Sequence, residues 1–181
     1  IVRDTIKKHK RIIFNGNNYA PEWVEEAARR GLKNLPTSVD AIPMLVEDKN
    51  IKLFTKHGVY TETELRSRCE ILLENYSKVI RIEALTMLDM SAKEIMPAVN
   101  KFLADTSAAA IAVKNVVAAA DCTMQESTIA EVSALLAETY KATKALQAAV
   151  DGAEEHEENV QGAAIYYRDQ VLPKMADLRT V

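Results

Sequence analysis

The residues best suited to catalysis or metal binding are few in this sequence and lie far apart. The three histidines, His9, His57 and His156, fall in three separate segments. Helical bundles can hold two-metal sites through Glu-x-x-His pairs, but the residues three before these histidines are Ile6, Phe54 and Ala153. A lone histidine is more often a surface or partly buried residue than a catalytic one. The sequence therefore predicts no catalytic, cofactor-binding or metal-binding residue in this chain.

Two charged runs come closest to an ion-binding motif. The acidic run at residues 154–158, EEHEE, is interpreted as the first turn of a helix, where the helix dipole favours negative charge. It does not extend to a zinc-protease motif, because Val160 stands where the second histidine of His-Glu-x-x-His would be. The basic run at residues 7–11, KKHKR, lies near an expected helix C-terminus, where positive charge is favoured. We interpret this second run as a solvated face.

Composition argues against several classes of function. With 181 residues, 48% of them hydrophobic, the chain is long enough to bury a core without a metal or a disulfide. The net charge of −3 comes from interspersed charges, which argues against nucleic acid as a partner. Cys69 and Cys122 are too few for a disulfide framework and favour a cytoplasmic location. Lys114 and Asn115 interrupt the Ala-rich run, so no membrane span is expected.

Glycine and proline divide the chain near residue 60. Before that point we expect four short helices, at residues 2–14, 21–30, 38–46 and 48–56. Gly31 and Gly58 follow the second and the fourth of them as stop signals. Asn15-Gly16 leaves one alternative open, because this dipeptide favours a two-residue turn between strands and the residues before it are locally strand-like.

From residue 61 onwards the sequence favours long helices. Thr61 and Glu64 form a capping box, and the apolar spacing after them predicts a very long helix to about residue 119. Pro97 lies inside this helix and is expected to kink it, because proline lacks the donor for the bond to residue 93. A break at residues 105–107 is left open as an alternative.

Two further capping boxes predict the starts of the last two helices. Thr128 pairs with Glu131, and Asp151 pairs with Glu154. At 1.5 Å per residue, the segments near 97–119, 128–151 and 153–179 have similar lengths and are joined by short turns. The expected fold is therefore all-α: short helices, then a very long Pro-kinked helix that forms an antiparallel three-helix bundle with the last two helices.

These predicted elements divide the chain into three parts. Residues 1–60 form a short-helix segment, residues 61–96 form the first half of the long connecting helix, and residues 97–181 form the bundle. The first half of the long helix is left to pack against the short helices or against another domain. Phe14, Trp23 and Pro97 are the candidate packing anchors.

Two stretches of the sequence are much more distinctive than the rest. One is Arg11 to Pro43, RIIFNGNNYAPEWVEEAARRGLKNLPTSVDAIP, and the other is Arg81 to Val99, RIEALTMLDMSAKEIMPAV. Both resemble the closing region of type III glutamine synthetases, in the same order and at a similar spacing. The resemblance is strongest from about Thr5 to Val99. The chain also opens on Ile1 inside a helical pattern, so it reads as a piece of a longer polypeptide.

The resemblance implies a much longer parent chain, with a β-grasp-like N-terminal domain, a central catalytic domain and a helical C-terminal region. It implies ATP and Mg or Mn as cofactors of the parent, a bacterial cytoplasm, and catalytic motifs upstream of Ile1. The implied partners are the rest of the parent chain and neighbouring subunits of a homo-oligomeric ring. The parent reaction is the ATP-dependent ligation of ammonia to glutamate, and this fragment alone is expected to be inactive.

The expected role is therefore a non-catalytic structural and assembly region. Two alternatives from other classes stay open. A freestanding helical scaffold or partner-binding module would show the same heptad spacing but would not be expected to carry the stretch Arg11 to Pro43. A regulatory ligand-binding bundle would need a polar pocket among Tyr140, Tyr166 and Tyr167.

Overall fold

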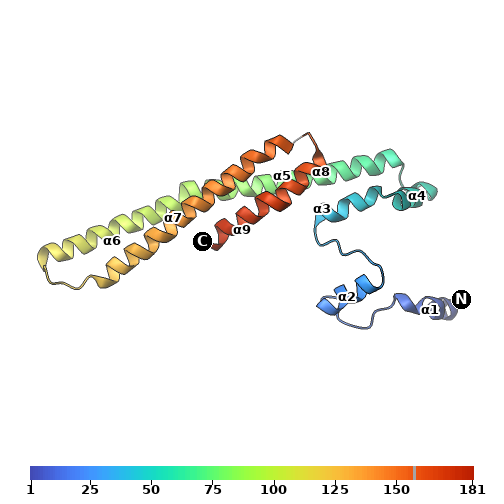
Figure 1. Cartoon of the computed structure of the whole chain (residues 1–181), viewed down its shortest axis with the longest axis horizontal. Helices are drawn as coiled ribbons and strands as arrows, with labels where there is room; N and C mark the ends of the chain where they lie inside the picture. The colour runs from blue at the N-terminus through green and yellow to red at the C-terminus, as the bar shows by residue number, and fades with distance from the viewer. Residues whose placement is uncertain (157) are drawn as a thin grey trace.

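The computed structural model describes residues 1–156 and 158–181, and in this part of the chain the secondary structure is entirely helical. The predicted all-α class is confirmed. Figure 1 shows a long rod of helices. Residues 1–33, which we call the arm, lie apart from the rod at one end, and the hairpin of α6 (Met96–Val116) and α7 (Thr123–Asp151) forms the other end. None of the described helices is long and apolar enough to cross a membrane.

The first third of the chain contains the predicted short helices. They are α1 (Val2–His9) continued by the 3-10 turn η1 (Lys10–Ile12), α2 (Pro21–Arg29), α3 (Ser38–Ala41) continued by η2 (Ile42–Val46), and α4 (Asp48–Lys56). Gly31 and Gly58 follow α2 and α4 with φ of 75° and 63°, in the left-handed region that favours glycine. The first helix is shorter than predicted, since Ile13 is already extended. The alternative hairpin at Asn15-Gly16 is wrong, because no strand flanks it in the described residues.

The long helix begins where its capping box predicts. The Thr61 backbone N–H donates to the Glu64 carboxylate at 2.7 Å, and the Glu64 N–H donates to the Thr61 hydroxyl at 3.2 Å. Helix α5 (Glu62–Met90) passes through a π-helical turn, η3 (Ser91–Ile95), into α6 (Met96–Val116), which contains residues 105–107 without a break. Pro97 therefore sits just after a wide turn, which is one of the known ways for a helix to accommodate proline.

The next helix starts earlier than the sequence predicts. Helix α7 (Thr123–Asp151) begins five residues before the predicted capping box, so Thr128 lies inside it. The Asp121 side chain accepts the Thr123 N–H at 2.9 Å instead. Glu131 binds the Ser127 hydroxyl at 2.8 Å, as a pair on one helical face. A Thr-x-x-Glu pattern inside a continuous helix has no free N–H groups to cap, which is why this prediction was wrong.

The last predicted capping box, at Asp151, is also wrong. Residues Gly152–His156 form the 3-10 turn η4, and α8 (Val160–Tyr166) starts from Asn159, whose side chain accepts the Gly162 N–H at 3.1 Å. Glu154 and Glu155 therefore lie in a 3-10 turn before this helix, and Glu157 of the acidic run lies outside the described residues. A second π turn, η5 (Tyr167–Val171), precedes α9 (Leu172–Thr180), which carries Pro173 in its first turn.

The main core lies where α5, α7 and the α8–α9 segment meet. Its buried residues are Ala84, Leu88, Leu146, Val150, Ala153, Tyr167, Val171 and Leu178. The last segment thus packs on the second half of α5 and on α7, whereas α6 packs along α7 as a two-helix hairpin. The sequence placed residues 97–119 in the bundle, and the structure puts the second half of α5 there instead. The prediction rested on similar helix lengths, and these do not determine which helices pack together. The turn after α7 brings α8 beside α5, so α5 completes the bundle.

A smaller core attaches the short helices to the rod. Val39 packs with Cys69 and Leu73 of α5 and with Ala164 of α8. Beside it the Arg168 guanidinium donates to the Asp40 carboxylate at 2.6 Å, and the Thr37 hydroxyl donates to the other Asp40 oxygen at 2.6 Å. Helix α3 is therefore held to the C-terminal segment by apolar packing and by one ion pair.

The burial of α5 can be tested at two adjacent leucines. Leu73 is 3% exposed, and its replacement by alanine should lower the free energy of unfolding by about 2–5 kcal/mol, because a cavity opens in the smaller core. Leu72 is 45% exposed and provides the matched control, with an expected loss below about 1 kcal/mol. Chemical denaturation followed by circular dichroism measures both. Equal losses would contradict the described face of α5.

Candidate functional site

The histidines and the acidic run are not brought together by the fold. His9 ends α1, His57 follows α4, and the His156 ring stacks on Tyr166 with 4.5 Å between centroids. In residues 1–156 and 158–181 no group of three or more histidine, cysteine, aspartate or glutamate side chains lies close enough to hold a metal ion.

The three tyrosines of the regulatory alternative have different surroundings. Tyr140 is exposed on α7, with the Lys144 ammonium 5.6 Å from its ring centroid. Tyr166 lies against His156, and Tyr167 is buried in the main core. These positions do not converge on one polar pocket.

The densest set of functional side chains is the Arg30 cluster, which we define as Arg11, Phe14, Trp23, Glu26, Arg29 and Arg30. Pro21 at the first turn fixes the start of α2, so Glu26, Arg29 and Arg30 follow at helical spacings of three and four residues. The chain before α2 turns back, so that residues 11–14 lie against the same helix. Sequence reasoning selected Phe14 and Trp23 but missed the charged residues, although the Glu26–Arg30 spacing was a usable signal.

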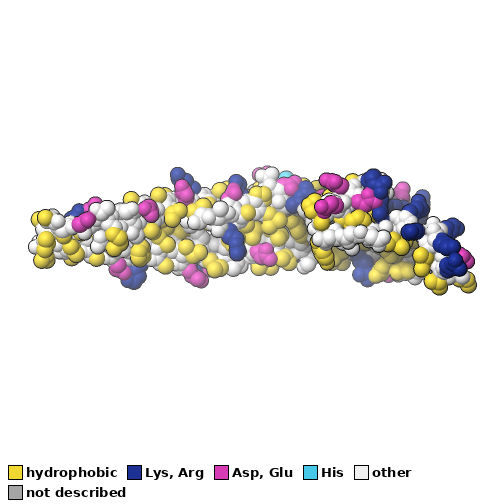
Figure 2. Space-filling view, turned by 90° about the horizontal axis from the view of Figure 1, so that it is seen from below, with side chains coloured by type: hydrophobic (Ala, Val, Ile, Leu, Met, Phe, Trp, Pro, Cys, Tyr) yellow, Lys and Arg dark blue, Asp and Glu magenta, His cyan; other side chains and the backbone are white. Residues whose placement is uncertain are grey.

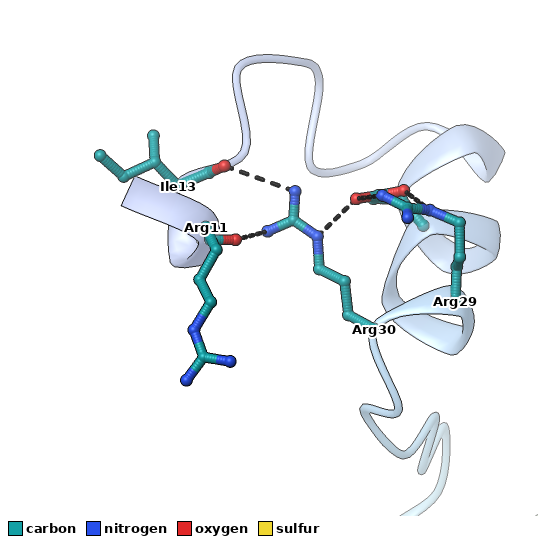
Figure 3. Close-up of polar contacts among 5 residues, drawn as sticks. Arg11, Ile13, Arg29 and Arg30 are labelled. Atoms are coloured by element: carbon teal, nitrogen blue, oxygen red, sulfur yellow. Dashed lines mark hydrogen bonds and ion pairs between the residues drawn. The ribbon is translucent and has the colours of Figure 1, made fainter. Parts of the chain in front are cut away.

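Arg30 binds two residues that precede it by 19 and 17 positions in the sequence, Arg11 and Ile13. Its guanidinium donates to the backbone carbonyl oxygens of Arg11 at 3.0 Å and Ile13 at 3.4 Å. Its Nε donates to the Glu26 carboxylate at 2.5 Å. Figure 3 shows the guanidinium between these three acceptors, with the Arg11 side chain directed away from it. A single side chain thus satisfies carbonyl groups in the extended chain and fixes that chain against α2.

The predicted anchors Phe14 and Trp23 lie against each other in this cluster. Their ring centroids are 4.7 Å apart at an interplanar angle of 44°. The Arg30 guanidinium carbon lies 5.9 Å from the Phe14 centroid and 5.8 Å from the Trp23 centroid, within the range of cation–π attraction. Gly16 makes this possible, because a Cβ there would come within 2.6 Å of the Phe14 ring. Pro97, the third predicted anchor, lies in α6 and is exposed.

Glu26 is the electrostatic centre of the cluster. Arg29 donates two hydrogen bonds to it, each at 2.6 Å, in addition to the bond from Arg30. The hydrogen bonds from Arg29 and then from Arg30 lower the pKa of Glu26 to about 2. One carboxylate thus faces the guanidinium groups of Arg29 and Arg30, and with Arg11 the cluster keeps an excess of positive charge.

A cavity of about 610 Å³ opens beside the cluster. Its walls combine apolar side chains with three guanidinium groups and one carboxylate, from Ile12, Ile13, Trp23, Leu32, Arg11, Arg29, Arg30 and Glu26. This lining carries neither a nucleophile nor a group with a pKa suited to general acid–base catalysis. It fits a protein segment that has both acidic and apolar side chains, so the geometry favours docking over chemistry.

Comparison with known proteins shows the family to which the chain belongs. Residues 1–114 match the family model described as the glutamine synthetase C-terminal domain. The chain belongs to this family. A glutamine synthetase of Butyrivibrio fibrisolvens is 40% identical over 179 residues, which cover 99% of this chain and 25% of that protein. A type-3 glutamine synthetase of Dictyostelium discoideum is 43% identical over 98 residues, covering 54% of this chain and 13% of that protein.

A glutamine synthetase of Bacteroides fragilis is 32% identical over 97 residues, 54% of this chain and 13% of that protein. This glutamine synthetase C-terminal domain thus spans a quarter or less of the relatives it matches. The resemblance carried by Arg11 to Pro43 and Arg81 to Val99 is confirmed, since both stretches lie in the matched residues 1–114. The Arg30 cluster lies in the first of those stretches.

The pKa of Glu26 predicts how the cluster responds to acid. A carboxyl whose pKa falls on folding contributes stability above its unfolded value, and this contribution is lost as the pH falls through the folded pKa, here about 2. The fluorescence of Trp23, the single tryptophan, should therefore stay constant from neutral pH to about pH 4 and change below about pH 3. Glu26→Gln should remove this transition and Glu22→Gln should keep it. A fluorescence midpoint near pH 4.5 would contradict the assigned ion pairs.

The contact of Arg30 with residues 11–14 can be tested separately from the contact of Arg29 with Glu26. Arg30→Ala should speed amide hydrogen exchange at residues 11–14, because two carbonyl contacts and the stack on Phe14 are lost. Arg29→Ala removes two hydrogen bonds to the same Glu26 but none outside α2, so exchange at residues 11–14 should change little. Mass-spectrometric hydrogen exchange compares the two variants. The same effect in both would show that Arg30 does not fix the extended chain.

Proposed function

We propose that this chain is a non-catalytic structural and assembly region of a glutamine synthetase. The parent reaction is the ATP-dependent ligation of ammonia to glutamate, carried out by residues outside this chain. ATP and Mg or Mn would be held by residues outside this chain as well, and the described residues bring together no group of three or more metal-ligating side chains. Its partners are the rest of the parent chain and neighbouring subunits of a homo-oligomeric ring.

The amount of exposed surface is the observation that carries this proposal. The chain exposes 12,959 Å². A monomeric globular protein of 20.1 kDa is expected to expose about 8,700 Å². The excess is equivalent to several protein–protein interfaces of standard size. A chain of this shape is suited to being covered by other polypeptide, as an accessory region of a large enzyme would be.

The N-terminal arm supports contact with the rest of the parent chain. Helix α1 buries none of its residues, and the arm exposes large apolar side chains at Ile6, Ile12, Ile13, Tyr19 and Leu32. Figure 2 shows Lys and Arg side chains gathered at this end of the rod. The arm therefore presents apolar and positive groups together. The Arg30 cluster would fix its shape before docking, and the complementary surface would be apolar and acidic.

The link from the arm to the rod supports a mechanical role. Lys33, at the end of the arm, forms an ion pair with Glu47 just before α4. The Asp40–Arg168 ion pair then joins α3 to the C-terminal segment. A force or movement at the arm would thus reach the bundle through short helices that are packed on α5 and α8. A cytoplasmic location completes the proposal, since Cys69 and Cys122 are both buried and unpaired.

Deletion of residues 98–181 from the full-length enzyme tests the proposal. Loss of the large oligomer, measured by light scattering, is expected. A second variant replaces only residues 104–131 by a short glycine linker and keeps the main core, so that loss of assembly is not confused with misfolding. The isolated chain should form no glutamine from glutamate, ammonia and ATP. An unchanged oligomer in both deletions, or activity of the isolated chain, would overturn the proposal.

A further inference from the structure

The α6–α7 hairpin carries a long apolar face that the described residues of the chain leave uncovered. The C-terminal end of α9 lies beside the middle of α7, where it lines a groove together with the start of α6. This groove has a volume of about 530 Å³. Its lining includes Ile95, Val99, Leu135 and Leu136 beside the hairpin, and Leu178 and Val181 at the C-terminal end of α9. We call these six apolar residues the groove. The exposed Arg179 lines it as well.

The same face reaches the far end of the hairpin. Residues spaced seven apart on a helix share one of its sides. The series that starts at Ile95, the last residue of η3, continues on α6 through Phe102 and Ala109 to Val116. All four are exposed, and Val116 reaches 85%. Val117 and Met124, at the turn between α6 and α7, are also exposed. We call Val116, Val117 and Met124 the tip.

The geometry points to a second copy of this chain as the partner of this face, an inference that rests on the proposed assembly role. We propose that two hairpins pair antiparallel, so that the tip of each fills the groove of the other. The tip projects and the groove is recessed, and both are apolar and lie on one face. Such a surface is complementary to itself under a two-fold rotation. The result is a four-helix contact in which every groove receives a tip.

The exposure and the charges agree with this partner. The exposed fraction of the apolar side chains on this face runs from 43% at Val113 to 85% at Val116, and an antiparallel pair of hairpins would cover them in both copies. Between Ile95 and Val116 the seven-residue series carries no charge. The nearby charges are already paired within the chain, Lys101 with Asp105 and Lys114 with Glu126. The apolar series on α6 therefore meets its own copy without repulsion, and Arg179, the charged side chain in the groove lining, faces an uncharged tip.

The middle of the face also suits a close approach. The groove and the tip are about 25 Å apart along α6, because 17 residues separate Val99 from Val116 at 1.5 Å each. The two-fold axis then falls close to Thr106 and Ala109. The small side chain of Ala109 lets the two α6 helices come close at the axis, and Phe102 and Val113 flank it on the same side. Figure 2 shows apolar side chains over this end of the rod.

Sedimentation equilibrium of the 181-residue chain tests the pairing. The chain should form a dimer of twice its 20.1 kDa mass. Val116→Glu and Leu135→Glu, which place a charge in the tip or in the groove, should each weaken the dimer by at least about tenfold. The matched control is Ile111→Glu, because Ile111 is 61% exposed on the other side of α6. This control should dimerise as the unchanged chain does.

Disulfide trapping tests the direction of pairing, including the case in which a glutamate variant does not fold. A Val116→Cys chain mixed with a Leu135→Cys chain should cross-link on oxidation, because the tip meets the groove. The Val116→Cys chain alone should not, since its two thiols would lie about 25 Å apart. The native cysteines are buried and give little background.

Three results would overturn the pairing: a monomer at all concentrations, a dimer that neither glutamate weakens, or preferential cross-linking of Val116→Cys to itself. None of them alone removes the assembly role. If the full-length enzyme still loses its oligomer on deletion of residues 98–181, assembly uses a different face of the chain. If that oligomer is unaffected while the isolated chain dimerises through tip and groove, the pairing stands and the assembly role fails.

Discussion

The meeting of three helical segments at Ala84, Leu146 and Val171 determines the position of every other element. These three side chains are fully buried, each with 0% exposure, and they come from α5, α7 and the second π turn. A small residue on α5 allows the larger side chains of the other two segments to enter. Because the contact lies near the middle of the rod, α6 and the first half of α7 extend beyond it on one side. The short helices attach on the other side.

The π turns show how proline is used beside this core. In the described residues each of them ends two residues before a proline, Pro97 or Pro173. A π turn adds one residue to a helix and rotates the residues that follow. The first turn places the Ser91 hydroxyl 2.7 Å from that of Thr143, and Thr143 donates to the Thr139 carbonyl at 2.8 Å. The buried hydroxyl groups are thus satisfied, and the wide turn is held against α7.

Local signals determined how much of the fold could be predicted. Pro21, Gly31 and the Thr61–Glu64 capping box are decided by their own backbone geometry, and the structure confirms each of them. The same Thr-x-x-Glu pattern at Thr128 failed, because packing along α6 continues the helix through it. The Arg30 cluster depends on carbonyl groups 17 and 19 residues away, so spacing within α2 could reveal the Glu26–Arg30 pair but not its target. Which helix completes the bundle likewise depends on contacts between residues that are far apart in the sequence.

The distribution of charge separates contacts that shape the chain from contacts that are left for a partner. Most ion pairs lie on exposed helical faces at spacings of three or four residues, where each contributes little to stability. The Asp40–Arg168 pair instead joins different segments and is partly buried, and it fixes the short helices to the bundle. Glu26 pairs with Arg29 and Arg30 at the same helical spacings, but Arg30 also donates to the Arg11 and Ile13 carbonyls and so fixes that part of the chain to α2. Beyond the core, the hairpin has apolar surface but no such cross-segment pair apart from Lys114 with Glu126 among the described residues. Its shape is therefore set by α6 packing on α7, and its remaining face is available for association.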